Sequence, residues 1–123
     1  MPKTVLDVGN CAPDHAAIRR MLTNNFDVTV LQTDQAQDTL ELLAKQPVDL
    51  ILVNRKLDCD YSDGMRIIEQ LKGDQRYSSI PVMLVTNYED HQDQAVSVGA
   101  LRGFGKLALS APETLASLGQ VLN

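Results

Sequence analysis

Short apolar runs alternate with segments of helical periodicity along the chain. The runs lie at residues 4–8, 28–31, 50–53, 81–86 and 101–106, and their length is typical of strands. Residues 50–53 are apolar without interruption, which is the pattern of a strand buried on both faces of a parallel sheet. The alternation predicts a doubly wound α/β domain with five parallel strands and helices on both faces.

The segments between these runs carry helix signals. Pro13 opens the first helix, Thr33 or Asp34 caps a second over residues 35–45, and Gly73 closes the third. A fourth helix is expected over 89–98, and a Ser-x-x-Glu capping box at 110–113 opens the last. The side chains expected to face the core are Ile18, Met21, Leu22, Leu40, Leu43, Ala44, Met65, Ile68, Leu71, Leu115, Leu118, Val121 and Leu122.

Composition narrows the class of protein. The 123 residues fit a single domain over 1–123. A net charge of −5, with basic residues spread thinly, argues against a nucleic-acid-binding surface. No apolar segment approaches the roughly 18 residues needed to span a membrane. Two cysteines and the lack of a secretory leader favour a cytoplasmic protein.

Polar residues follow three strands, at the edge where α/β sheets bind ligands. Asn54 follows the central strand, Thr86 the fourth and Lys106 the fifth. An amide orients and hydrogen-bonds, but it is a poor nucleophile and brings no charge to hold a cation. Asn54 is therefore expected either to cap its own loop or to accept a hydrogen bond from the Lys106 ammonium.

The order of these residues resembles that of response-regulator receiver domains. The resemblance implies a flavodoxin-like three-layer fold with strand order 2-1-3-4-5. It also implies a site where an acidic pair binds Mg²⁺ beside a phospho-accepting aspartate. The residues that carry the resemblance are 4–11, Asn54, Asp63, Gly64, Thr86 and Lys106.

The acidic residues of that site are missing here. Asn54 stands where the family has its phospho-accepting aspartate. The acidic pair maps to Gly9 and Asn10, or to Asn10 and Cys11, and neither choice supplies a carboxylate. The resemblance thus implies a pseudo-receiver, not phosphorylated in the standard way, whose binding of Mg²⁺ is weak or absent.

Other family positions are retained. Thr86 matches the switch hydroxyl, Lys106 the phosphate-binding ammonium, and Phe104 lies within one residue of the switch aromatic. Leu107 replaces a proline that follows a cis bond in the family, and a cis bond before another residue costs about 2.5–4 kcal/mol. This loop is therefore expected to be rebuilt.

The expected function is signalling by protein–protein interaction, without enzymatic activity. In the family, the surface of the fourth helix, fifth strand and fifth helix contacts partners or a second copy. That surface corresponds here to residues 89–106 and 111–123.

Two alternatives use other acids. Asp7 lies inside a strand, so it either has a partner or reaches the sheet edge. At the edge it would serve as a metal ligand, or as the nucleophile of a phosphatase similar to haloacid dehalogenases. Asp58 and Asp63 are candidates for a displaced phospho-acceptor.

The cysteines and histidines suggest a third chemistry. Cys11, Cys59, His15 and His91 belong to edge loops or their neighbourhood, which would suit Zn²⁺ or a redox pair, but their spacing supports neither. Both cysteines are expected to be buried as small hydrophobic residues.

Overall fold

The sheet at the centre of the molecule has five parallel strands in the order 2-1-3-4-5, which confirms the predicted fold. The computed structural model describes residues 2–123. The strands are β1 (Lys3–Val8), β2 (Val28–Thr33), β3 (Leu50–Asn54), β4 (Val82–Val85) and β5 (Leu101–Phe104). The helices are α1 (Ala12–Asn25), α2 (Ala36–Leu43), α3 (Met65–Lys72), α4 (Glu89–Ser97), the 3₁₀ helix η1 (Lys106–Ala108) and α5 (Pro112–Leu122).

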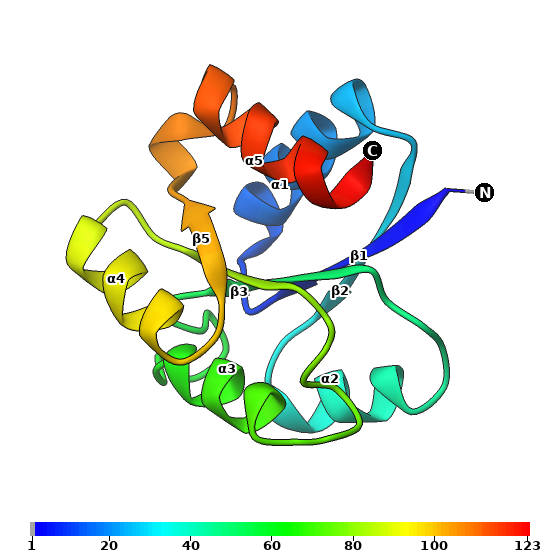
Figure 1. Cartoon of the computed structure of the whole chain (residues 1–123), viewed down its shortest axis with the longest axis vertical. Helices are drawn as coiled ribbons and strands as arrows, with labels where there is room; N and C mark the ends of the chain where they lie inside the picture. The colour runs from blue at the N-terminus through cyan, green and yellow to red at the C-terminus, as the bar shows by residue number, and fades with distance from the viewer. Residues whose placement is uncertain (1) are drawn as a thin grey trace.

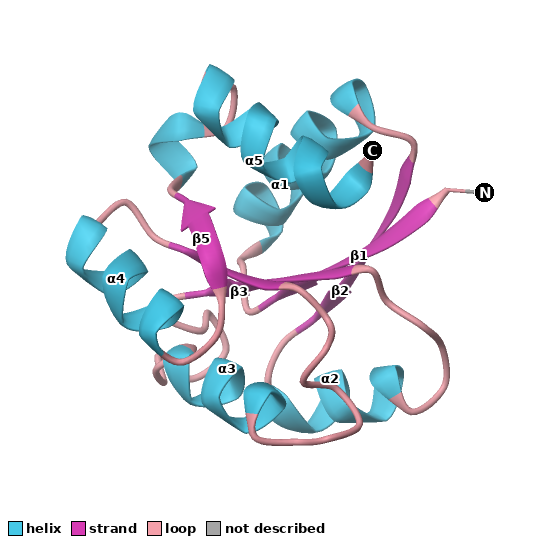
Figure 2. Ribbon diagram, in the orientation of Figure 1, coloured by secondary structure: helices cyan, strands magenta, loops and turns pink. Residues whose placement is uncertain are grey.

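Helices cover both faces of the sheet (Figure 1, Figure 2). Helices α1 and α5 lie on one face, and α2, α3 and α4 on the other. Alternate side chains of β3 divide between the two cores: Leu50 and Leu52 pack towards α1 and α5, and Ile51 and Val53 towards the other layer. All four are fully buried, as the uninterrupted apolar run predicts.

Strand register brings three chain segments to one edge of the sheet. Val8 pairs with Val53, and Asn54 pairs with Val85. The residues that follow these pairs, Gly9 and Thr86, therefore lie beside Asn54 at the carboxyl edge. Among the described residues, 2–123, no helix is long and apolar enough to cross a membrane.

The start of the last helix differs from the prediction. Helix α5 begins at Pro112, its N-cap is Ala111, and no side chain caps it. The predicted capping box, from Ser110 to Glu113, is therefore wrong. Proline is favoured at the first helical position, because it has no N–H that needs a hydrogen-bond partner. With Pro112 at that position the N-cap is Ala111, so Ser110 lies one residue too early to cap the helix.

The start and end of α2 also differ. Neither Thr33 nor Asp34 is the N-cap, which is Gln35, and Gln35 forms a reciprocal capping box with Asp38. Ala44, expected to face the core, is the exposed C-cap residue. The helix is shorter than the predicted 35–45, so Ala44 lies beyond its last turn.

Strand β5 ends earlier than predicted. It stops at Phe104, two residues before Lys106, and its pairing with β4 is irregular between Met83 and Val85. Lys106 opens the 3₁₀ helix η1 instead. None of the peptide bonds described over 2–123 is cis, and Leu107 lies in this turn with an 89% exposed side chain. The loop after the lysine is thus built as a helical turn.

Candidate functional site

Asn54 ends β3 at the carboxyl edge and binds the backbone of two neighbouring loops. Its Nδ2 donates to the carbonyl of Lys56 at 2.7 Å and to that of Gly9 at 3.3 Å. Both hydrogen bonds need an amide, because a carboxylate has no N–H to donate. The loop-capping interpretation of Asn54 is therefore confirmed.

Gly9, a position of the acidic pair in the first of the two alternatives, has a backbone suited to glycine. Its φ is +83°, in the left-handed region. A Cβ placed on Gly9 would lie 2.4 Å from Cδ2 of Leu57, a residue that is 3% exposed. The Gly9 carbonyl also accepts the N–H of Asp58 at 2.9 Å. A side chain at this position would require Leu57 to shift and would have to adopt a strained, positive φ.

Asp7 lies inside β1 and is completely buried. Its Oδ1 accepts Nδ2 of Asn10 at 2.5 Å, and its Oδ2 lies 2.7 Å from Nδ1 of His15, which belongs to α1. Burial raises the pKa of the Asp7 carboxyl, although the hydrogen bonds from His15 and Asn10 act in the opposite direction. Asp7 therefore has partners instead of a free oxygen at the edge, and the phosphatase hypothesis has no accessible nucleophile.

The Lys106 ammonium binds Asp14 and not Asn54. Lys106 Nζ lies 2.8 Å from Asp14 Oδ2, in the first turn of α1. The hydrogen bond from Lys106 lowers the pKa of the Asp14 carboxyl. The predicted contact between Lys106 and the Asn54 amide oxygen is wrong, because an ammonium gains more from an ionised carboxylate than from a neutral amide.

Thr86 is buried just after β4. Its Oγ1 lies 3.0 Å from Nδ1 of His91 and accepts the backbone N–H of Tyr88 at 3.3 Å. A shallow cavity of about 170 Å³ joins these residues to the rest of the edge. It is lined by Asn54, Arg55, Val85, Thr86, Asn87, Tyr88, His91 and Lys106. The cavity thus collects three of the predicted site positions, Asn54, Thr86 and Lys106.

Phe104 faces the interior. Its side chain is 5% exposed and belongs to the core formed with α1 and α5. Its backbone carbonyl accepts the N–H of Thr86 at 3.0 Å. The backbone of Phe104 is therefore bound to the end of β4, while its ring packs in that core.

The loop acids have different surroundings. Asp58 is exposed. Asp63 Oδ1 accepts Nη1 of Arg55 at 3.0 Å and the backbone N–H of Met65 at 2.9 Å, so it fixes the start of α3. Asp58 is the more exposed of the two residues, and the Asp63 side chain, although engaged, is itself 41% exposed.

The cysteines are not buried as predicted. Cys11 is half-buried and Cys59 is exposed, and both are free thiols. Cys59 lies on the long polar loop, with Sγ 3.4 Å from the Asp34 carbonyl. Over the described residues, no three His, Cys, Asp or Glu side chains are grouped to hold a metal ion.

The donor set at this edge does not fit the Mg²⁺ of receiver domains. Mg²⁺ takes oxygen ligands and is usually held by one or two carboxylates. Here both oxygens of Asp7 are hydrogen-bonded and Asp14 is paired with Lys106. Within residues 2–123 the buried Oδ1 of Asn10 has no hydrogen-bond partner, but this amide oxygen is neutral and does not replace a carboxylate.

Two contacts of the site were missed from the sequence. Asp14 gives no signal in the sequence beyond that of an acidic residue in the first turn of a helix, yet its carboxylate binds Lys106. Gln92 was not singled out, yet its buried amide donates to the Leu84 carbonyl at 3.0 Å and accepts the N–H of Gly103 at 2.8 Å. A buried glutamine on a polar helix gives no periodic signal that would distinguish it.

Comparisons with known proteins agree with the fold. The family model of the response regulator receiver domain matches residues 11–107. The chain therefore belongs to the response regulator receiver domain family. No curated protein sequence matches it.

Solved structures show the same fold at low identity. Chemotaxis response regulator CheY4 of Vibrio cholerae is 18% identical, with a TM-score of 0.75, covering 99% of this chain and 100% of that one. The receiver domain of a DNA-binding response regulator (merR) from Colwellia psychrerythraea 34H is 20% identical, with a TM-score of 0.79, covering 96% of each chain. The Mn²⁺-bound form of response regulator Rcp1 is 17% identical, with a TM-score of 0.70, covering 98% of this chain and 91% of that one.

Proposed function

We propose that this receiver domain, over residues 1–123, signals by binding a protein partner and is not phosphorylated in the standard way. The observation that carries the proposal is the Asn54 amide, whose two hydrogen bonds to backbone carbonyls require an N–H donor. An amide in this role is not a nucleophile, so the position cannot accept a phosphoryl group.

Gly9 supports the proposal independently. An acidic side chain at this position would meet Leu57 and would have to adopt a positive φ. The missing carboxylate therefore matches the local backbone conformation, and a single substitution at Gly9 would not restore an acidic site.

The proposal includes weak or absent binding of Mg²⁺. The carboxylates nearest the edge are already occupied, Asp7 by Asn10 and His15, and Asp14 by Lys106. The Lys106 ammonium already occupies the position beside the Asp14 carboxylate where a metal cation would bind most favourably.

The site test is a titration with Mg²⁺ followed by amide NMR. We expect no saturable shifts at Asp7, Asn10 or Asn54 at millimolar Mg²⁺. Saturable shifts confined to these residues, absent with K⁺ at equal ionic strength, would contradict the proposal. The comparison with K⁺ separates binding from screening, because exposed charges respond to any salt.

A further inference from the structure

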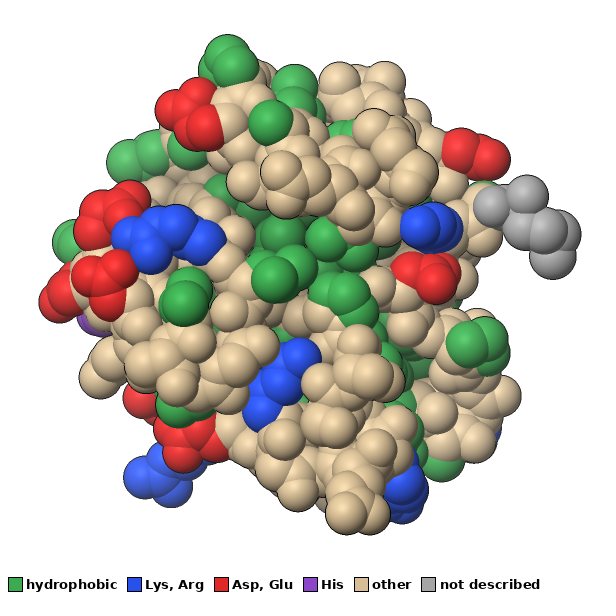
Figure 3. Space-filling view, viewed as in Figure 1, with side chains coloured by type: hydrophobic (Ala, Val, Ile, Leu, Met, Phe, Trp, Pro, Cys, Tyr) green, Lys and Arg blue, Asp and Glu red, His purple; other side chains and the backbone are tan. Residues whose placement is uncertain are grey.

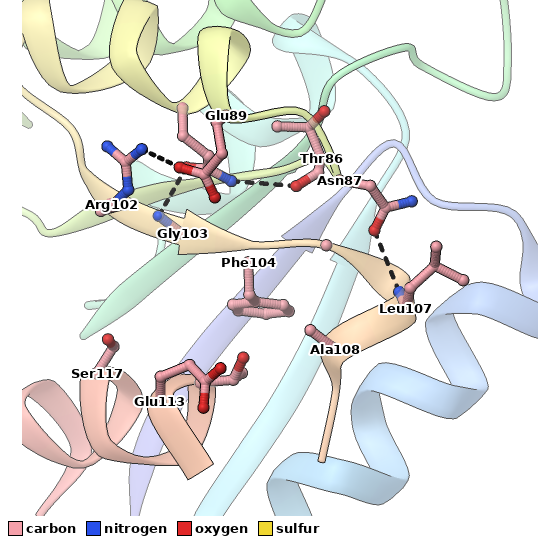
Figure 4. Close-up of a pocket in the computed structure, with 13 residues that line it drawn as sticks. Thr86, Asn87, Glu89, Arg102, Gly103, Phe104, Leu107, Ala108, Glu113 and Ser117 are labelled. Atoms are coloured by element: carbon pink, nitrogen blue, oxygen red, sulfur yellow. Dashed lines mark hydrogen bonds and ion pairs between the residues drawn. The ribbon is translucent and has the colours of Figure 1, made fainter. Parts of the chain in front are cut away.

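A cavity of about 350 Å³ lies between α4, β5 and the start of α5 (Figure 4). It is separate from the edge cavity at Asn54, although both contact Thr86 and Asn87. Its volume is near the lower end of the range found for ligand sites, about 300–1,000 Å³. The cavity therefore has room for one large side chain and its flanking backbone.

Most of the residues that line this cavity are polar, and its apolar side chains are those of Phe104, Leu107 and Ala108. The Phe104 ring lies beneath β5, with Ala108 of η1 beside it (Figure 4). Leu107 lines the outer side and exposes 89% of its side chain. Such a side chain gains about 25 cal/mol per Å² when a partner covers it.

The rim is acidic. Glu89 on α4 and Glu113 on α5 line opposite sides of the cavity, as Figure 4 shows. Among the described residues that line the cavity, Arg102 is the only basic one, and it is already engaged: it binds Glu89, and its Nη1 lies 3.0 Å from Asp93 Oδ1. Figure 3 shows basic atoms set among acidic side chains over α4 and β5. Three carboxylates thus face one guanidinium, and the surface has a net negative charge.

The backbone of β5 does not favour an added strand. β5 is the last strand in the sheet order, so one of its edges faces no other strand. The amide oxygen of Gln92 accepts the N–H of Gly103 at 2.8 Å, which occupies this donor of the strand. A partner is therefore better held by side chains in the cavity than by strand pairing.

We propose that this cavity binds a basic segment of a partner protein that inserts one large apolar side chain. The apolar side chain packs on Phe104 and Leu107, and the flanking Lys or Arg residues pair with Glu89, Asp93 and Glu113. An incoming guanidinium competes with Arg102 for Glu89 and Asp93, which frees Arg102 to move. This inference rests on the proposed partner-binding function and adds the chemistry of the partner.

The test uses two synthetic peptides and amide NMR. The first peptide has alternating Lys and Arg around a single Phe, and the second replaces its basic residues by Glu. We expect the basic peptide to cause saturable shifts at Glu89, Arg102, Gly103 and Phe104, and the acidic peptide to cause none. Equal shifts with both peptides, or no saturable shift at the cavity, would overturn the proposal.

Two variants locate the binding site. The triple variant Glu89→Gln, Asp93→Asn and Glu113→Gln should weaken the basic peptide by about tenfold, because its ion pairs are lost. The matched variant Asp27→Asn, Glu41→Gln and Glu69→Gln makes the same change of charge on exposed positions outside the cavity, and should leave affinity within about twofold. Equal weakening by both variants would mean that only net charge is sensed, and would overturn the proposal.

A cavity-filling variant tests the apolar part. Ser117 of α5 lines the cavity, and Ser117→Phe should abolish the shifts at Phe104 while the thermal unfolding transition stays cooperative. Unchanged peptide binding by a folded Ser117→Phe protein would contradict insertion. Failure of these tests is distinct from failure of the proposed function, because phosphorylation of the chain is measured separately by mass.

Discussion

The ammonium of Lys106 lies 2.8 Å from the carboxylate of Asp14, across 92 positions of the sequence. The pair joins the start of η1 to the first turn of α1, so it links the segment after β5 to the segment after β1 at the carboxyl edge of the sheet. Both side chains are partly exposed, Lys106 by 31% and Asp14 by 40%. The ion pair therefore contributes little to the stability of the fold, and its main effect is to hold η1 against α1 at the carboxyl edge.

A double-mutant cycle measures this pair. We expect Asp14→Asn and Lys106→Met to lower the free energy of unfolding with a coupling of about 0.5–1 kcal/mol, since the pair is solvent-screened. The folded-state pKa of Asp14 is lowered, so its contribution is present above the ordinary value of 3.8 and is lost as pH falls through the folded pKa. Urea titrations at neutral and acidic pH measure both the coupling free energy and its dependence on pH. Coupling that persists fully in strong acid would contradict the assignment.

The opposite dependence is expected of Asp7. Burial raises its pKa, so the folded state favours the protonated form, and stability from this group is lost as pH rises above the ordinary value of 3.8. Asp7→Asn keeps a partner for both Asn10 and His15 and removes the titration. The variant should therefore gain stability relative to the natural protein as pH rises from acidic to neutral.

Asp7→Leu is the control for that prediction. It removes the acceptor of two buried contacts, one from Asn10 and one with His15. We expect a loss of about 2–4 kcal/mol, because each buried polar group left without a partner costs about 1–3 kcal/mol. The midpoint of urea unfolding measures it. A Leu variant as stable as the Asn variant at neutral pH would contradict the importance of these contacts.

The backbone at Gly9 gives a third prediction. Gly9→Ala introduces a Cβ at a φ of +83° and 2.4 Å from Leu57 Cδ2, so we expect a loss of at least about 1–3 kcal/mol. Gly73→Ala is the matched control, because its Cβ would lie 3.3 Å from the nearest atom, the Glu69 carbonyl oxygen, and its φ is −86°. Thermal unfolding should separate the two variants. Equal unfolding midpoints would show that the loop beside Leu57 shifts to accommodate the added methyl group, and would contradict the prediction.

Asn54→Asp tests the amide directly. The carboxylate would face the carbonyls of Lys56 and Gly9 without a hydrogen to share, so we expect a loss of about 1–3 kcal/mol. Asn87→Asp is the matched control, since Asn87 uses its Oδ1 to accept the N–H of Leu107 and an aspartate keeps that acceptor. A more stable Asn54→Asp protein would contradict the role assigned to the amide.

The sequence predicted the fold well because its signals are local. The apolar run of β3 and the closing glycine of α3 correspond to the structure within one residue. The errors occur where neighbours compete. The end of β5 depends on an irregular pairing with β4, and the capping box at Ser110 fails because Pro112 already begins the helix.

The site was predictable only in part. The positions of Asn54, Thr86 and Lys106 at one edge follow from the strand order, and all three line one cavity. Their hydrogen-bond partners do not follow, because Asp14 and His15 are placed by the rotation of α1 against the sheet. The acidic rim of the cavity between α4, β5 and α5 was likewise not predictable, because Arg102, Glu89 and Asp93 come together only when α4 packs beside β5.

Intact mass after incubation with a small-molecule phosphodonor and Mg²⁺ tests the central claim most directly. The natural protein and Asn54→Asp are compared under identical conditions. We expect no added phosphoryl group on either protein, because the carboxylates that would hold the metal are occupied. A stable adduct on the natural protein would contradict the account, and peptide mapping would then show whether the exposed Asp58 or another acid accepts it.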